Sequence, residues 1–141
     1  MRAFLLVEDE DAMAVVFRAA VDEASLPVIV YRVSNGEEAL EYLHAPPPRQ
    51  RPNVVFLDLS MPRMTGWEVL EGMRVDERLR TIPIVIFTTS SRSADKERAY
   101  ALGAQHFLTK PVTFAGLVNE IEAVYRRFVS GDANSAASGG A

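Results

Sequence analysis

The chain has 141 residues, enough for one domain of ordinary size with a single core. Its 15 lysines and arginines against 19 aspartates and glutamates give a net charge of -4, and without a basic stripe the chain is not expected to bind nucleic acid. It has no cysteine, which excludes disulfides and thiolate metal sites and agrees with a reducing compartment.

The N-terminal segment is not typical of a secreted or membrane protein. Only five residues separate Arg2 from the first acidic residue, Glu8, too few for the apolar core of a signal peptide. No apolar run approaches the length of a membrane span. We therefore expect a cytoplasmic protein that does not associate with a membrane.

The first third of the chain reads as strand, helix, strand, helix. Residues 3–7 form an apolar run. Apolar residues then recur at the spacings of an amphipathic helix, at Met13, Val16, Phe17, Ala20 and Val21. A second apolar strand is predicted at 28–33, and Ser34 with Glu37 forms a capping-box pattern that opens the next helix. The apolar side of that helix carries Ala39, Leu40 and Leu43.

Residues 44–53 form a connection that can continue neither a helix nor a central strand. The segment contains four prolines, two arginines and a glutamine. A proline-rich recognition segment has a similar composition, but a stiff exposed loop is the interpretation we favour.

The strand predicted at 54–57 leads directly into a carboxylate. Four consecutive apolar residues are typical of a strand covered on both faces, as in a parallel sheet. The run ends on Asp58, and Met61-Pro62 then marks a turn. Reactive groups in open parallel sheets lie outside the carboxyl ends of the strands, where Asp58 stands. Taken alone, an aspartate here fits the start of an ordinary loop better.

The alternation continues after this strand. Thr65-Gly66 opens a third helix, whose apolar side carries Val69, Leu70 and Met73. Residues 84–87 form a fourth strand that runs into Thr88. The helix predicted at 93–102 has a thin apolar face, so it buries little area at about 25 cal/mol per Å² and can shift at low cost. That face consists of Ala94, Ala101 and Leu102, and Gly103 ends the helix.

The last strand and helix complete the domain. Residues 106–109 form a fifth strand that ends at Lys110-Pro111, and Thr113 caps the final helix. Apolar residues cover more of this helix than one buried stripe requires; they are Phe114, Leu117, Val118, Ile121, Val124, Tyr125 and Phe128. Residues 130–141 are mostly Gly, Ser, Ala and Asn, which predicts a disordered tail.

Five strands that alternate with five helices predict a single α/β domain over residues 1–129. The expected architecture is a doubly wound, five-stranded parallel sheet with strand order 2-1-3-4-5 and right-handed crossovers. In this order strands one, three, four and five are consecutive neighbours. Their carboxyl ends therefore lie at the same edge of the sheet.

Three carboxylates are expected to meet at this edge, from Glu8, Asp9 and Asp58. Because they repel one another, the cluster needs a cation, and an all-oxygen set of ligands favours Mg²⁺ with several retained waters. We expect Asp9 and Asp58 to coordinate directly, with the Ser60 backbone carbonyl as a third ligand. Glu8 would act through water or as an outer ligand.

Asp58 is then placed to act as a nucleophile toward phosphorus and to form an acyl phosphate. Lys110 would compensate the charge of the transferred phosphoryl group, and the Thr88 hydroxyl would donate a hydrogen bond to it. Taken singly, Lys110 fits a surface turn and Thr88 fits a satisfied strand-end hydroxyl. Their coincidence at successive strand ends favours a reaction site.

These residues resemble the receiver domain of two-component response regulators, over residues 3–129. The resemblance rests on Val7-Glu8-Asp9, Phe56-Leu57-Asp58, Met61-Pro62, Gly66, Thr88-Thr89 and Lys110-Pro111, and on their spacing. It implies a flavodoxin-like fold and a histidine kinase that phosphorylates Asp58 while Glu8 and Asp9 hold Mg²⁺. Thr88 and Lys110 would read the phosphorylated state. It also implies a signalling protein rather than an enzyme, with only self-phosphorylation and self-dephosphorylation at Asp58.

More narrowly, the chain is similar to the stand-alone receivers that partner bacterial and cyanobacterial phytochrome kinases. The similarity lies in the proline-rich loop, in segments 59–64 and 82–90, and in the lack of an output domain. It implies a bacteriophytochrome kinase as partner and a homodimer through the fourth helix, fifth strand and fifth helix. Ser60 and Ser90 are small and uncharged, so the lifetime of the phosphoryl group is not implied.

A switch with two conformations follows from the resemblance. Phosphorylation of Asp58 would draw the Thr88 hydroxyl toward the phosphoryl oxygens and leave space for Phe107 to turn inward. Phe107 stands where the best-known chemotaxis receiver has a tyrosine, so it can rotate but cannot donate a hydrogen bond. The thin fourth helix and the broadly apolar fifth helix fit an association surface, although Tyr125 and Phe128 fit packing at the core edge equally well.

Three competing interpretations have weaker support. An aspartate-nucleophile phosphohydrolase needs a second acid two residues after the nucleophile, where this chain has Ser60. A flavin-binding module needs hydroxyls and glycines after its first strand, where the chain has four acids at 8–11. A degenerate receiver that acts only as a scaffold would not need the complete set of acids, threonine and lysine.

Overall fold

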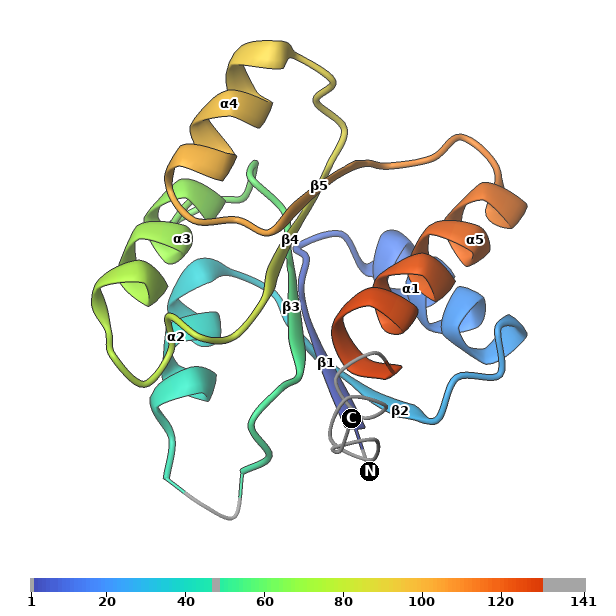
Figure 1. Cartoon of the computed structure of the whole chain (residues 1–141), viewed down its shortest axis with the longest axis horizontal. Coiled ribbons are helices and arrows are strands. Elements are labelled where there is room, and N and C mark those ends of the chain that lie inside the picture. Colours follow the sequence, from blue (N-terminus) through green and yellow to red (C-terminus); the bar gives the residue numbers. More distant parts are fainter. Residues whose placement is uncertain (1, 47–48, 131–141) are drawn as a thin grey trace, which may run out of the picture.

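Five parallel strands form the centre of the molecule in the order β2-β1-β3-β4-β5, which confirms the predicted topology (Figure 1). The strands are β1 (Arg2–Val7), β2 (Val28–Val33), β3 (Val54–Leu57), β4 (Ile84–Thr88) and β5 (His106–Thr109). This computed structural model describes residues 2–46 and 49–130. The chain is therefore a doubly wound α/β domain of the flavodoxin-like type.

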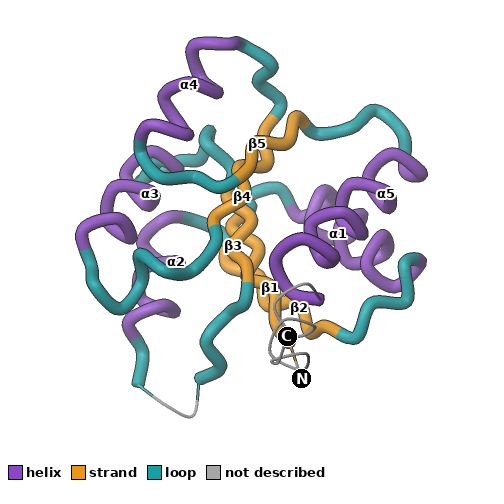
Figure 2. Tube along the Cα trace, viewed as in Figure 1, coloured by secondary structure: helices purple, strands orange, loops and turns teal. Residues whose placement is uncertain are grey.

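Helices cover both faces of the sheet. They are α1 (Asp11–Glu23), α2 (Gly36–His44), α3 (Gly66–Val75), α4 (Ser93–Ala101) and α5 (Phe114–Tyr125), which a short π-helix, η1 (Arg126–Ser130), continues. Figures 1 and 2 show α2, α3 and α4 on one side of the sheet and α1 and α5 on the other. Within the described parts of the chain, no helix is long and apolar enough to cross a membrane.

The central strand β3 shows why the sheet is buried on both faces. Val54 and Phe56 pack toward α1 and α5, whereas Val55 and Leu57 pack toward α2 and α3. All four side chains are completely buried. The ring of Phe56 makes an edge-on contact with Phe17 of α1 at 4.9 Å between centroids. The apolar run that predicted this strand is thus explained by a core on each side.

The start of α2 corrects one prediction. The N-cap is Asn35 rather than Ser34, and the Asn35 side chain accepts a hydrogen bond from the Glu38 backbone N–H. Glu38, not Glu37, reaches back, and its carboxylate accepts from the Ser34 N–H at 2.7 Å. Asparagine is as good an N-cap as serine, so the two registers could not be separated by residue type. The predicted cap of α5 is confirmed at Thr113, and α3 begins at Gly66 as predicted, with Thr65 as its N-cap.

Two helices bury partly different residues from those predicted. In α1, Ala14 is buried while Val16 is 38% exposed. In α4, Ala94 and Ala101 are exposed, and Ala99 is the buried residue. The thin apolar face of α4 is confirmed, but the predicted face is rotated by part of a turn from the one that is buried. Alanine is small enough for either side of a helix, so it gave little information on orientation.

The structure also shows how the end of α5 and the proline-rich loop pack against the domain. Tyr125 and Phe128 are half-buried and pack against the core on the α1 side, so they lie at the core edge. In the proline-rich loop, Pro52 is buried and the Tyr42 hydroxyl donates to the Gln50 carbonyl at 2.9 Å. The predicted tail over 130–141 lies outside the described residues except for Ser130, which ends η1.

Gly66, the first residue of α3, lies against the backbone that carries Asp58. A β-carbon at position 66 would clash with the Asp58 carbonyl oxygen and lie 2.7 Å from the Leu59 Cα. Gly66→Ala is therefore expected to lower the free energy of unfolding by about 1–3 kcal/mol, as overpacking does. Chemical denaturation would measure this change.

Gly72, inside α3, provides the matched control. A β-carbon there would lie 3.4 Å from the nearest atom, a Leu40 methyl, which is an ordinary contact. Gly72→Ala should stabilise the protein by roughly 0.5–1 kcal/mol, because alanine favours a helix interior. Equal effects of the two substitutions would contradict the close contact at position 66.

Candidate metal and phosphoacceptor site

The register of the sheet brings the predicted site residues to one edge. Val7 of β1 pairs with Leu57 of β3, and the Asp58 N–H donates to the Val7 carbonyl at 3.2 Å. At the other side of β3, the Lys110 N–H donates to the Thr88 carbonyl at 2.6 Å. The predicted convergence of these strand ends is therefore present.

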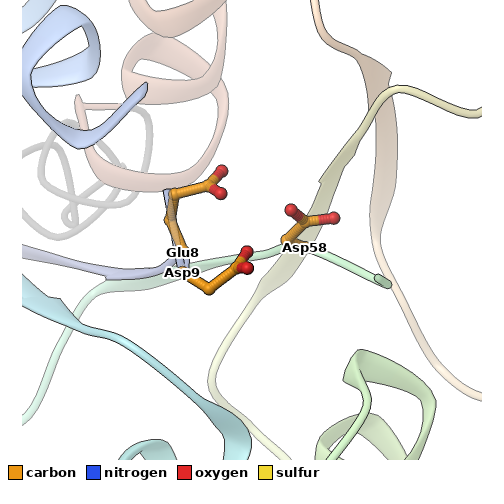
Figure 3. Close-up of side chains that lie close together, drawn as sticks. All are labelled: Glu8, Asp9 and Asp58. Carbon is orange, nitrogen blue, oxygen red and sulfur yellow. The ribbon is translucent and has the colours of Figure 1, made fainter. Parts of the chain in front are cut away.

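Three carboxylates form a cluster at this edge. Glu8, Asp9 and Asp58 each offer one carboxylate oxygen, and these three oxygens lie within 4.8 Å of one another. Figure 3 shows the three side chains side by side. Glu8 and Asp58 are buried and Asp9 is exposed, so the cluster is open to solvent on one side. Hard oxygen ligands with an open side fit Mg²⁺, which usually keeps several of its waters. The donor set thus agrees with the predicted metal.

Lys110 places its ammonium between the two buried acids. Its Nζ lies 2.7 Å from Glu8 Oε1 and 3.1 Å from Asp58 Oδ2. Burial raises the pKa of Glu8 above the ordinary value for glutamate, and Lys110 offsets only part of this effect. Burial acts to lower the pKa of Lys110, but Glu8 and Asp58 outweigh it and hold that pKa above its ordinary value. Three carboxylates against one ammonium leave negative charge for a divalent cation to offset.

The raised pKa of Glu8 gives a pH dependence. The folded protein keeps the Glu8 proton to higher pH than the unfolded chain does, so this group favours folding at acid pH, and its contribution is lost as the pH rises through the raised pKa. Glu8→Gln cannot ionise. In the presence of a chelator, the Tm of the variant minus that of the wild type should therefore increase from acid toward neutral pH. A difference that is constant across this range would contradict the charge burial at Glu8.

Both oxygens of the Asp58 carboxylate have a partner. Oδ1 accepts from the Ser60 N–H at 3.1 Å, and Oδ2 faces Lys110. Position 60 carries an exposed hydroxymethyl group, so the acid that an aspartate-nucleophile phosphohydrolase needs two residues after its nucleophile is missing from this position. The contacts with Ser60 and Lys110 therefore hold the Asp58 carboxylate in place.

Thr88 is buried beside a hollow of about 390 Å³ that Ser60, Trp67 and Ser90 also line. Its hydroxyl accepts a long hydrogen bond, 3.5 Å, from the Ser90 N–H. Ser90 in turn donates from its hydroxyl to Asp95 of α4 at 2.6 Å. A movement of the Thr88 hydroxyl would thus be transmitted through Ser90 to Asp95, in the first turn of α4.

Phe107, the second residue of the predicted switch, is buried in this structure. Only 7% of Phe107 is exposed, and it packs in the core on the α4 side with Ala99 and Ala104. The Lys96 ammonium lies 5.9 Å from the ring centroid. The ring is therefore covered in this conformation, and its turn on phosphorylation stays a prediction.

Arg32 was missed as a site neighbour. It lies in β2, which reads as an apolar strand, yet its side chain donates to the Glu8 carbonyl at 2.8 Å and to the Asp11 carboxylate at 2.8 Å. The available signal was the position of Arg32. It stands one residue before the end of an apolar strand, at the edge of the sheet that carries Glu8 and Asp58.

Comparison with known proteins agrees with this geometry. The family model of the response regulator receiver domain matches residues 4–122. The chain is 37% identical over 122 residues to a probable methanogenesis regulatory protein, FilR2, of Methanothrix harundinacea, covering 85% of this chain and 79% of FilR2.

Two solved structures are also similar. The phosphorylated cyanobacterial phytochrome response regulator RcpA has a TM-score of 0.82 at 29% identity, over 92% of this chain and 94% of RcpA. The bacteriophytochrome response regulator AtBRR has a TM-score of 0.74 at 35% identity, over 86% of this chain and 91% of AtBRR. With its fold, its acidic cluster and these similarities, the chain belongs to the response regulator receiver domain family of two-component signalling.

Proposed function

We propose that this domain lies in the cytoplasm and accepts a phosphoryl group on Asp58 from a sensor histidine kinase, in a reaction that depends on Mg²⁺. One observation carries the proposal most directly. The Asp58 carboxylate is buried at a strand end, held by Ser60 and Lys110, and clustered with two further acids. Such a carboxylate is an oriented nucleophile beside a cation site.

In the transfer step an Asp58 oxygen forms a bond to phosphorus while the bond between phosphorus and the kinase histidine nitrogen breaks. The electron pair of that bond returns to the imidazole, which leaves. Asp9, Asp58, the Ser60 carbonyl and Glu8 would hold the Mg²⁺, which supplies charge neutralisation at the phosphoryl oxygens. Lys110, already 3.1 Å from Asp58, balances the added charge on the opposite side.

After transfer, Thr88 and Phe107 would read the new state. The Thr88 hydroxyl gives up its long bond with Ser90 and donates to a phosphoryl oxygen. Ser90 is bonded to Asp95, so α4 responds, and α4 is easily moved because Ala99 is its one buried residue. The surface of α4, β5 and α5, above Phe107, would carry the output.

Incubation with a small phosphodonor tests this function. In the presence of Mg²⁺, the intact mass of the wild type should increase by one phosphoryl group. With a chelator in place of Mg²⁺, the mass should stay unchanged over the same time. Phosphorylation that proceeds equally well in the chelator would contradict the role of the acidic cluster.

The similarity to the phytochrome response regulators RcpA and AtBRR supports a bacteriophytochrome kinase as partner. For self-association, the proposal is a homodimer through α4, β5 and α5. Tyr100 of α4 is 47% exposed and would lie in this interface. Sedimentation with and without a phosphoryl mimic should show a dimer in at least one condition. A monomer under both conditions would remove dimerisation from the proposal.

A further inference from the structure

Arg32 connects β2 to the loop that carries the acidic cluster. Its side chain is 18% exposed. Its Nε donates to the Glu8 carbonyl and its Nη1 to the Asp11 carboxylate, both at 2.8 Å. The neighbouring Val33 carbonyl accepts from the Glu8 N–H at 3.1 Å. Strand β2 therefore fixes both polar groups of the Glu8 backbone, one through its main chain and one through Arg32.

The loop between these two anchors contains Asp9. The loop leads into α1, which begins at Asp11, and the N-cap of that helix, Glu10, makes no side-chain capping bond. The ion pair of Arg32 with Asp11 thus holds a helix start that lacks the usual cap. Because Asp9 is exposed, the position of its carboxylate depends on the backbone on either side of it.

We propose that Arg32 is a positioning residue for the divalent cation site. By holding Glu8 and Asp11, it keeps the Asp9 carboxylate beside Glu8 and Asp58. It also engages Asp11, the first residue of α1, which takes no part in the cluster. The inference rests on the proposed Mg²⁺ dependence and adds a residue that does not touch the cation.

Stability alone does not account for Arg32. Among the described residues, its third nitrogen, Nη2, is buried and has no hydrogen-bond partner. A buried donor left unpaired opposes folding, and an apolar side chain of similar length would avoid that cost. The bonds that Arg32 does make lead to the acidic loop, which agrees with a role in holding that loop.

When Arg32 is replaced, the positioning role and simple electrostatics predict opposite changes in Mg²⁺ affinity. A positive charge close to the cluster repels Mg²⁺, so its removal alone would tighten binding. Loss of the two bonds that orient the loop would instead weaken binding. Mg²⁺ demands near-ideal octahedral geometry, whereas Ca²⁺ tolerates irregular geometry, so a misplaced Asp9 should harm Mg²⁺ binding more than Ca²⁺ binding.

Isothermal titration calorimetry with Mg²⁺ and with Ca²⁺ would test the proposal on the full chain. Arg32→Met should bind Mg²⁺ about tenfold more weakly than the wild type, as is usual when a group that orients a metal ligand is lost. Its Ca²⁺ affinity should fall less. Arg32→Lys keeps the charge but cannot make both bonds, so it should lie between the two proteins.

Arg18→Met is the matched control, because Arg18 of α1 also donates to a main-chain carbonyl of β2, that of Val30, at 2.8 Å. Its Mg²⁺ affinity should equal that of the wild type. Mg²⁺ affinity that is unchanged or higher in Arg32→Met would overturn the positioning role, as would an Arg32→Lys variant equal to the wild type. A wild type that binds no Mg²⁺ would instead contradict the proposed function itself.

Discussion

Asp58→Asn is expected to abolish phosphorylation of this protein while leaving its fold intact. The amide is not a nucleophile toward phosphorus, so no acyl phosphate can form. It keeps the size of the carboxylate and an oxygen that can accept from the Ser60 N–H. Lys110 retains its contact with Glu8. The variant should therefore show the thermal transition of a folded domain and no gain in mass with Mg²⁺ and a phosphodonor.

The same substitution at Asp22 is the control. Asp22 is exposed near the end of α1, and Asp22→Asn should be phosphorylated like the wild type. A phosphoryl group that appears on Asp58→Asn at the wild-type rate would place the acceptor elsewhere in the chain.

Lys110→Met should cause the largest loss of stability among single substitutions at the site. The Lys110 side chain is 8% exposed and its ammonium faces two buried carboxylates. Removal of one partner from a buried ion pair leaves uncompensated charge and typically costs roughly 3–5 kcal/mol. Denaturant unfolding at neutral pH in a chelator would measure this loss directly.

Two comparisons make this prediction specific. Lys96→Met removes an exposed ammonium from α4 and should change the free energy of unfolding by no more than about 0.5 kcal/mol. In the double variant Glu8→Gln/Lys110→Met, one of the two carboxylates that lose their partner is replaced by a neutral amide. This variant should therefore regain part of the lost stability. Equal losses for the two lysine variants would show that the buried ion pairs contribute little.

Strand order explains why most of the site could be predicted from the sequence. Apolar runs located the strands, and the order 2-1-3-4-5 placed Glu8, Asp58, Thr88 and Lys110 at one edge. This inference needs only the direction of each strand and its neighbours. Side-chain detail is not required, because residues that follow paired parallel strands are held together by the sheet itself.

Other features depend on geometry that residue types do not encode. Asn35 and Ser34 are equally suitable caps, and only the path of the chain from β2 selects Asn35. Phe107 could be buried or exposed at a strand position near a thin helix, and packing by Ala99 decides this. Arg32 looked like an ordinary polar residue in an edge strand, since its partners Glu8 and Asp11 come from a distant part of the sequence.

Asp58 is the proposed phosphoacceptor, and chemical trapping tests this assignment directly. After incubation with Mg²⁺ and a phosphodonor, borohydride reduces an aspartyl phosphate to the corresponding alcohol, which peptide mapping locates. We predict reduction at position 58 and at no other acid. Reduction at Asp9, or a phosphoryl group on His44, His106 or a serine with no reduction at position 58, would contradict the account.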